Sequence, residues 1–263
     1  MSNITERARK GLPLDDVMII DCHCHMGFWY NFHTPRNDAE GLLISMNTLG
    51  IDMACVTAHA SIGPNYRFGN DIVIDAVSKY SNRFIGYVTV NPNYVDYIRN
   101  ELDRCFNIPE FKGIKIHPAF HGCPVDYKNY RIAYETANEK GCIILIHTWG
   151  KGDITAVGRL ADQYPAAMFI MGHTGGTEGR AMEDAIEVIK RCDNVYADLA
   201  VSLAYEGNVE WFVREIGSKK VLFGSDMPFY DPRSGFGRVA MADISDEEKK
   251  DIFGLNMKKL LKK

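Results

Sequence analysis

Residues 17–25 carry the side chains best suited to chemistry, in the order VMIIDCHCH. An apolar run ends there in Asp21, His23 and His25. Because side chains alternate along a strand, these three are expected to point one way and the two cysteines between them the other. Two imidazoles at the end of a buried strand need a strong partner, since an unpartnered buried polar group is costly. A divalent metal ion suits them best, although hydrogen bonds to backbone carbonyls would satisfy this pair taken alone.

Three later segments end in residues of the same kind. ILIHT contains His147, IMGHTGG contains His173 and LFGSDMP contains Asp226. A catalytic metal site needs three or four deprotonated N or O ligands and keeps one position for water. We therefore predict one divalent ion held by four side chains: His23, His25, His147 and Asp226. His173 is expected to stand beside the ion and polarise a substrate or move a proton, and Asp226 to accept a proton as well.

Eight apolar runs, spaced about 30 residues apart, must position these side chains. We predict strands near residues 17–25, 53–57, 84–90, 113–117, 142–147, 167–173, 195–199 and 221–225. Helices are predicted at residues 38–49, 70–80, 93–106, 126–140, 153–163, 177–191 and 209–216, with a last helix after Ser245. Asn37 or Asp38 is expected to cap the first of these helices and Gly50 to end it, and Ser245 is expected to cap the last helix.

This alternation predicts a single α/β domain, a (β/α)₈ TIM barrel over residues 17–263, preceded by an N-terminal extension at residues 1–16. An open, doubly wound sheet is the alternative. The polar residues favour the barrel, because they fall at the C-terminal ends of the predicted strands. Those ends meet at one mouth in a barrel, whereas in an open sheet they spread along a line at about 4.8 Å per strand. The metal site is therefore expected at the C-terminal mouth.

The composition is that of a globular protein, with 263 residues, 46% hydrophobic and 24% charged. The formal net charge is −4, and lysines cluster only in the C-terminal KKLLKK, so no nucleic-acid partner is expected. No apolar run approaches the roughly 20 residues of a membrane span, and the first residues lack the apolar stretch of a signal peptide. We expect a cytoplasmic protein without a membrane partner, whose seven cysteines are reduced.

Taken together, several motifs resemble the amidohydrolase superfamily and, more narrowly, its amidohydrolase-2 (amidohydrolase-related) branch: DCHCH, GIKIHP, LIHT, GHTGG, FGSDMP and DIFGLNMKKLL. The resemblance covers nearly the whole chain. It implies a distorted, metal-bearing TIM barrel with the four ligands predicted above and His173 as the catalytic histidine. Two features depart from the branch. The chain is short, so substrate-lid insertions are small or absent, and Leu255 and Met257 flank Asn256 where the branch often has Gly and Ala.

Lys115 follows the fourth predicted strand and has two interpretations. Some members of the superfamily carry a carboxylated lysine there that bridges two metals, whereas a plain ammonium would bind a substrate carboxylate or pair with an aspartate. We expect the unmodified amine and one metal ion. Four residues are candidates for substrate binding: Lys115, His117, Trp29 and Trp149. His59 and His121 are expected to be ordinary loop histidines, and four loop cations to be solvated: Arg36, Lys151, Arg180 and Arg233.

Three classes of function remain. The first is a metal-dependent hydrolase that opens an amide, lactone or ester bond with a metal-activated water. The second is a metal-dependent, non-oxidative decarboxylase of an aromatic or unsaturated carboxylic acid. The third, a metal-binding or sensory protein, is disfavoured because it needs no proton-handling pair such as His173 and Asp226. A phosphoesterase is disfavoured by the acidic balance.

We favour the hydrolase, because a short chain leaves little lid to exclude water and decarboxylation gains from a dry site. Zn²⁺ is the expected ion, with Mn²⁺, Fe²⁺, Co²⁺ and Ni²⁺ as alternatives. The expected partner is a small-molecule substrate, and a homodimer is compatible with the sequence.

Overall fold

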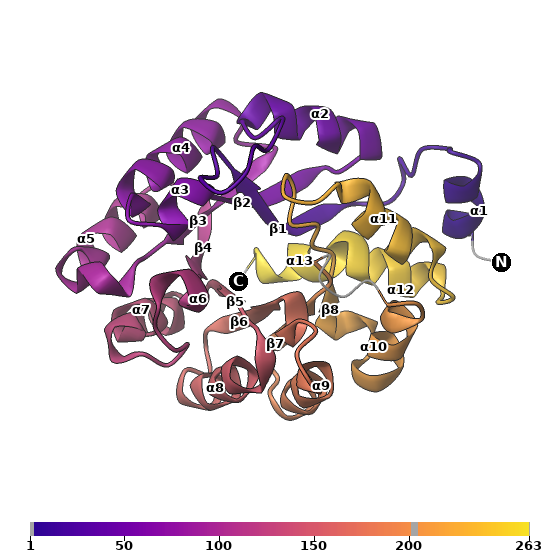
Figure 1. Ribbon diagram of the computed structural model, residues 1–263. Helices are drawn as coiled ribbons and strands as arrows, with labels where there is room; N and C mark the ends of the chain where they lie inside the picture. The colour runs from indigo at the N-terminus through magenta and orange to yellow at the C-terminus, as the bar shows by residue number, and fades with distance from the viewer. Residues whose placement is uncertain (1–2, 201–204, 263) are drawn as a thin grey trace.

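Eight parallel strands follow one another around a single sheet, in the order β1 to β8 (Figure 1). The computed structural model describes residues 3–200 and 205–262. The strands are β1 (Ile20–Met26), β2 (Met53–Ala58), β3 (Phe84–Thr89), β4 (Phe111–Ile116), β5 (Ile143–His147), β6 (Met168–Gly172), β7 (Val195–Asp198) and β8 (Val221–Leu222). All eight lie within three residues of the predicted positions, and the predicted TIM barrel is confirmed.

Backbone hydrogen bonds between β1 and the segment after β8 nearly close the sheet. The amide of Cys22 donates to the carbonyl of Phe223 at 2.9 Å, and the amide of His25 donates to the carbonyl of Met227 at 2.7 Å. The amide of Asp226 in turn donates to the carbonyl of His23 at 2.8 Å. The first and last strands therefore lie side by side, and an open sheet is excluded.

Helices surround this barrel (Figure 1). They are α1 (Asn3–Arg9), α2 (Ala39–Leu49), α3 (His59–Ile62), α4 (Tyr66–Lys79), α5 (Val95–Phe106), α6 (Pro118–His121), α7 (Arg131–Lys140), α8 (Gly150–Gln163), α9 (Ala181–Arg191), α10 (Asn208–Ile216), α11 (Pro232–Met241), α12 (Asp246–Lys250) and α13 (Asn256–Leu260). Four of them were not predicted: α1, α3, α6 and α11. Helix α1 packs against α11 and α12, and among the described residues we find no helix with the length and apolar character that crossing a membrane requires.

The predicted caps are present. The side chain of Asp38 accepts a hydrogen bond from the amide of Gly41, and Gly50 ends α2 in the left-handed conformation that glycine adopts at low cost. Ser245 and Glu248 form a capping box at the start of α12. These local signals are short-range, which is why the sequence alone identified them.

Apolar side chains form two layers. The barrel interior holds Ile20, Cys55, Ile85, Leu145 and Ile170, together with Met257 and Leu260 of α13. The C-terminal helix therefore packs against the same interior cluster as the strands. A larger cluster lies between the strands and the surrounding helices. With the interior filled by side chains, functional groups can gather only where the strands end.

The first strand departs from regular alternation. In its pairing with β2, Asp21 lies opposite Ala54, and Cys24 lies opposite Val56. Three steps along β1 therefore match two steps along β2, which is a β-bulge. A bulge adds one residue to a strand and re-aims the side chains that follow it.

The bulge overturns part of the prediction for this segment. Cys22 Sγ lies 3.7 Å from Asp198 Oδ1, and His23 Nδ1 lies 2.6 Å from Asp198 Oδ2, so these neighbours reach the same carboxylate. Asp21 instead accepts hydrogen bonds from the amides of His23 and Ser225. The predictions that Asp21 joins the histidines and that Cys22 points away from them were wrong, because both assumed an unbroken alternation.

Candidate metal centre

Three buried side chains from the two ends of the barrel sheet converge at its mouth. His23 and His25 come from β1, and Asp226 follows β8. The Nε2 atoms of the two histidines lie 3.3 Å apart. Asp226 Oδ1 lies 3.7 Å from His23 Nε2 and 3.1 Å from His25 Nε2. We call these three residues the His–His–Asp trio.

The trio fits a divalent ion. Ligand atoms that each lie about 2.1 Å from one ion are roughly 3.0–3.5 Å apart in octahedral or tetrahedral geometry, close to the distances observed here. Asp226 Oδ1 is buried and, although His25 Nε2 is near, no well-aligned hydrogen bond from a described residue reaches it. An orphaned acceptor facing two ring nitrogens needs a cation, and imidazole with carboxylate is a donor set that Zn²⁺ and Mn²⁺ both accept.

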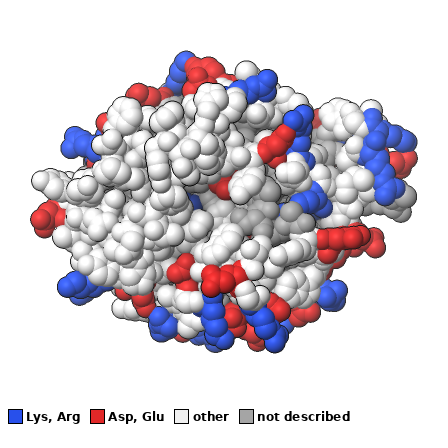
Figure 2. All heavy atoms as spheres, in the orientation of Figure 1, with Lys and Arg blue, Asp and Glu red and all other residues white. Residues whose placement is uncertain are grey.

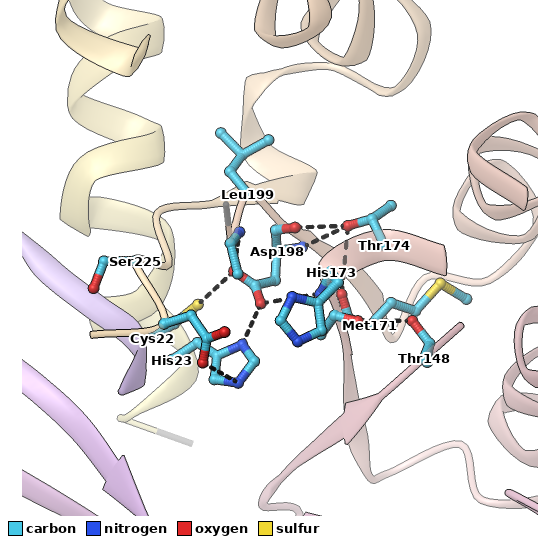
Figure 3. A network of polar contacts seen from close by, with 12 residues as sticks. Cys22, His23, Thr148, Met171, His173, Thr174, Asp198, Leu199 and Ser225 are labelled. Atoms are coloured by element: carbon cyan, nitrogen blue, oxygen red, sulfur yellow. Dashed lines mark hydrogen bonds and ion pairs between the residues drawn. The ribbon is translucent and has the colours of Figure 1, made fainter. Parts of the chain in front are cut away.

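The Nδ1 atoms of the two histidines also have polar contacts. His23 Nδ1 contacts Asp198, which ends β7 (Figure 3). His25 Nδ1 lies 3.2 Å from Thr57 Oγ1. Such contacts fix the orientation of metal-binding rings. The chain thus orients both imidazoles with their Nε2 atoms toward Asp226.

The backbone around the site takes unusual conformations. Asp226, His173 and Thr174 all have positive φ, at 60°, 64° and 45°. Non-glycine residues in this region store of order 1–3 kcal/mol of strain each, and such residues concentrate at functional sites. The strained backbone after β6 and β8 is therefore of the kind found at functional sites.

The two remaining histidines of the predicted set lie in the same mouth. The ring of His173 is 5.0 Å from the ring of His23 and 4.7 Å from the ring of His147. The ring of His147 stacks on that of His117 at 4.0 Å, with an angle of 14° between the planes. The ligand atoms that lie within 4.8 Å of one another are those of the trio, without His147. The role of His147 as a fourth ligand, and that of His173 in catalysis, stay predictions.

A cavity of about 350 Å³ opens above these residues and is lined by His25, His147, His173 and Asp226. Aromatic rings make up much of its wall: Trp29, Phe32, Phe120, Trp149, Phe229 and Tyr230. Among the described residues, no lysine or arginine lines it. In the view of Figure 2, charged side chains lie mostly along the periphery, and the left part of the face is nearly uncharged. The cavity is thus an aromatic enclosure over a polar floor.

Lys115 lies in that floor. Its side chain is fully buried, and its Nζ is 2.9 Å from His23 Nε2. Burial lowers the pKa of Lys115 to about 8, against the opposing charges of Asp226 and Asp198. Burial also raises the pKa of the Asp226 carboxyl, and the ammonium of Lys115 opposes that shift.

The pKa values of His23, His25 and His173 all fall well below their ordinary value, mainly through burial. Neutral imidazoles are the form that binds a metal.

Of the four candidates for substrate binding, Trp29, Trp149 and His117 line the cavity and Lys115 lies beneath it. Tyr30 follows β1, as Trp29 does, but its side chain is exposed and does not line the cavity. None of the four loop cations lines the cavity. Three of them pair with exposed or half-buried carboxylates: Lys151 with Asp184, Arg180 with Glu183 and Arg233 with Asp231.

His59 and His121 are not ordinary loop residues, so this prediction was wrong. His59 begins α3, donates from Nδ1 to the carbonyl of Gly27, and stacks on Phe229 at 4.0 Å. His121 ends α6 and hydrogen-bonds Tyr130 at 2.5 Å. Both are buried, because the short helices after β2 and β4 fold over the mouth.

One residue at the site was assigned no role from the sequence. The carboxylate of Asp198, at the end of β7, contacts both His23 and the backbone of His173. Its position at the end of a buried strand, VYAD, was the available signal. The contact itself depends on closure of the sheet, which places β7 next but one to β1, with β8 between them.

The comparisons with known proteins agree with this architecture. The profile of the family named Amidohydrolase matches residues 20–263. A comparison with curated proteins gave no match. Among solved structures, one similar protein is provisionally named an amidohydrolase, from Staphylococcus aureus, with 19% identity, a TM-score of 0.74, and 94% of this chain and 100% of that chain covered.

Two further structures are those of decarboxylases. One is 5-carboxyvanillate decarboxylase from Novosphingobium aromaticivorans with manganese and 4-hydroxy-3-methoxy-5-nitrobenzoic acid, at 19% identity, a TM-score of 0.75 and coverage of 95% and 97%. The other is dihydroxybenzoic acid decarboxylase from Polaromonas sp. JS666 with manganese and 2-nitroresorcinol, at 16% identity, a TM-score of 0.72 and coverage of 94% and 97%. At these identities the structures establish a shared fold. The family match extends over nearly the whole barrel, and on that ground this chain belongs to the Amidohydrolase family, the amidohydrolase-related TIM barrels.

Proposed function

We propose that this protein is a metal-dependent, non-oxidative decarboxylase of a small aromatic carboxylic acid. The observation that carries the proposal is the cavity. Aromatic side chains wall a space of about 350 Å³ directly over the His–His–Asp trio. This volume is at the lower end of the range for small-molecule sites, which suits a single substituted ring. Aromatic walls bind such a ring through stacked and edge-to-face contacts.

The trio and Lys115 suit a substrate with a carboxylate. A divalent ion bound by the trio would supply positive charge for a carboxylate or phenolate oxygen of the substrate. Lys115 adds a second positive charge beside His23. Since no lysine or arginine among the described residues lines the cavity wall, the anionic end of the substrate is drawn to this floor.

Decarboxylation breaks the bond between the ring and the carboxylate carbon and releases CO₂. The electron pair remains on the ring carbon, which then takes up a proton. His173 and Asp226 both line the cavity and are the two residues we propose for handling that proton. Trp29 is buried, with its ring packed edge-on against Phe120 and Phe229, and these rings restrict the access of water.

The sequence favoured a hydrolase because a short chain leaves little lid to exclude water. The aromatic residues after β1, β4 and β8 supply much of that cover with few residues. The similar decarboxylases of known structure support the same choice, since two of them hold aromatic ligands and manganese. Zn²⁺ and Mn²⁺ are both candidates for the ion, and metal analysis of the purified protein decides between them.

The test is metal-dependent CO₂ release. The protein is stripped of metal, reloaded with Mn²⁺ or Zn²⁺, and incubated in D₂O with 2,6-dihydroxybenzoate or 5-carboxyvanillate. We expect CO₂ and a product with one deuterium at the former carboxyl position. Hydrolysis of a lactone or amide by the loaded protein, with no CO₂ from any aromatic acid, would favour the hydrolase.

Two carboxylates five residues apart provide the matched variants. Asp226→Asn removes the charge of the trio and is expected to abolish turnover. Asp231→Asn changes an exposed carboxylate that pairs with Arg233 and should leave turnover unchanged. Equal activity of both variants would rule out the trio as the reactive centre.

A further inference from the structure

Asp198 connects the metal centre to the segment that carries His173 (Figure 3). Its carboxylate is fully buried at the end of β7. Oδ2 lies 2.6 Å from His23 Nδ1 and accepts from the amide of His173 at 3.3 Å. Oδ1 accepts from the amide of Ala200 at 2.9 Å and from Cys22 Sγ at 3.7 Å. One side chain thus contacts a candidate metal ligand and a candidate catalytic residue.

We propose that Asp198 is a positioning residue that fixes the ring tautomer of His23 and holds the backbone turn that presents His173. The proposal rests on the trio as a metal site, as the proposed function does, but not on decarboxylation as the reaction. It gives Asp198 a role without direct contact with substrate.

The tautomer follows from two contacts on opposite sides of the His23 ring. His23 Nδ1 and Asp198 Oδ2 lie 2.6 Å apart, and the same oxygen accepts from the amide of His173, so we assign the proton to Nδ1 and the accepting role to Asp198. A lysine ammonium only donates, so the Nε2 that lies 2.9 Å from Lys115 must carry a lone pair. Both contacts fit the same tautomer, with the lone pair on Nε2, the nitrogen that faces Lys115 here and would bind a metal. The aspartate therefore keeps the correct nitrogen turned toward His25 and Asp226.

The turn after β6 depends on the same residue. His173 and Thr174 are consecutive non-glycine residues with positive φ, a conformation that needs support from its surroundings. The hydroxyl of Thr174 donates to the carbonyl of Asp198 at 2.8 Å and accepts from its amide at 3.0 Å. Together with the bond from the His173 amide to the carboxylate, three hydrogen bonds fasten this turn to Asp198.

Gly224 leaves the space that the carboxylate of Asp198 occupies. A Cβ at Gly224 would lie 1.9 Å from Asp198 Oδ1 and 3.1 Å from His23 Cβ. Only a residue without a side chain lets the segment after β8 pass so close to both. The FGSD segment therefore supplies Asp226 to the trio and also leaves room for Asp198.

The first experiment measures metal binding and the tautomer. Removing a carboxylate that orients a metal-binding histidine typically weakens metal affinity 10- to 100-fold. We expect that loss in Asp198→Asn and Asp198→Ala, measured by competition between the protein and a chromogenic chelator for Zn²⁺. The matched control is Cys22→Ser, which alters a contact with the same carboxylate and should keep the affinity of the unaltered protein.

The tautomer is read directly from the metal-free, unaltered protein. Long-range ¹H–¹⁵N spectra distinguish a histidine protonated at Nδ1 from one protonated at Nε2, and His23→Gln identifies the signal. We expect His23 protonated at Nδ1. Protonation at Nε2, or unchanged Zn²⁺ affinity in both Asp198 variants, would overturn the proposal. Neither readout involves turnover, so failure of the decarboxylase assignment leaves this test intact.

The second experiment separates the role toward His173 from metal binding. Thr174→Val keeps the size of the side chain but removes the hydroxyl, whereas Thr174→Ser keeps the hydroxyl. We expect Thr174→Val to lower kcat at least 10-fold while the protein retains its metal, and Thr174→Ser to recover most of the rate. Equal kcat in Thr174→Val and the unaltered protein would contradict the proposed support of His173.

Discussion

Replacing His173 by Asn separates catalysis from metal binding. The ring of His173 is near those of His23 and His147, but the ligand atoms that converge belong to the trio. His173 also has a φ of 64°, a region that Asn tolerates better than most residues. His173→Asn therefore removes the imidazole without forcing the turn to change. We expect the variant to fold and to keep about one metal per chain.

The size of the effect follows from what the imidazole does. Burial holds the pKa of His173 well below its ordinary value, so at neutral pH the ring is uncharged, with one ring nitrogen that carries a proton and one that can take one up as it is passed on. General acid–base assistance is typically worth 10²–10⁴-fold, or roughly 2.7–5.4 kcal/mol in the barrier. We expect kcat of His173→Asn to fall by about that factor, with little change in KM.

The assay compares two variants of the same chemical kind. Metal content is measured by elemental analysis, and kcat by CO₂ release, for His173→Asn and His147→Asn. As predicted from the sequence, His147→Asn should lose metal and activity together, because His147 is the fourth predicted ligand. If His173→Asn loses its metal as readily as His147→Asn, His173 is a ligand, and the scheme with a free catalytic histidine must be abandoned.

Three further predictions follow. Chelation should lower Tm by roughly 5–10 °C when the metal had been at about 100 times its Kd, because such binding contributes about 2.7 kcal/mol; an unchanged Tm in differential scanning calorimetry would argue against a metal bound by the folded state. Lys115→Met should raise KM for aromatic carboxylates at least 10-fold and leave binding of an uncharged ring analogue unchanged, as measured by calorimetric titration; equal losses for both ligands would exclude a charge-specific role. Burial lowers the pKa of His121 to about 4, below its value of about 6.5 in the unfolded chain, so the unfolded chain binds the extra proton and stability falls as the pH drops from about 6.5 to about 4. His121→Gln should reduce that pH dependence by roughly 3 kcal/mol in urea unfolding, and an identical dependence in both proteins would show that His121 does not carry it.

Much of the fold could be read from the sequence because its signals are local. Runs of apolar residues bounded by turn formers marked all eight strands, and capping residues such as Asp38 and Ser245 marked helix ends. The short helices α3 and α6 were missed, because four residues give no helical periodicity and form only where the chain packs over the barrel mouth. Helix α1 was missed for a related reason: Asp246 caps its first amides from the far end of the chain.

The candidate site was predictable in its residue types and only partly in its geometry. Strand-end positions placed His23, His25 and Asp226 in one mouth, and there the structure brings them together. The bulge in β1 could not be foreseen, since it depends on how the strand pairs with β2 and not on the composition of the strand. It put Cys22 beside His23 and turned Asp21 toward the backbone of Ser225.

By itself, then, the sequence determined the barrel, the chemistry of the side chains at its mouth and the family. Only the tertiary structure decided which groups meet: Asp198 with His23 beside the closure of the sheet, Lys115 with the same ring from its other side, and aromatic rings from four separate segments around one cavity. The physical reason is that periodicity and capping act within a few residues, whereas these contacts join strands and loops that are neighbours only after the sheet has closed.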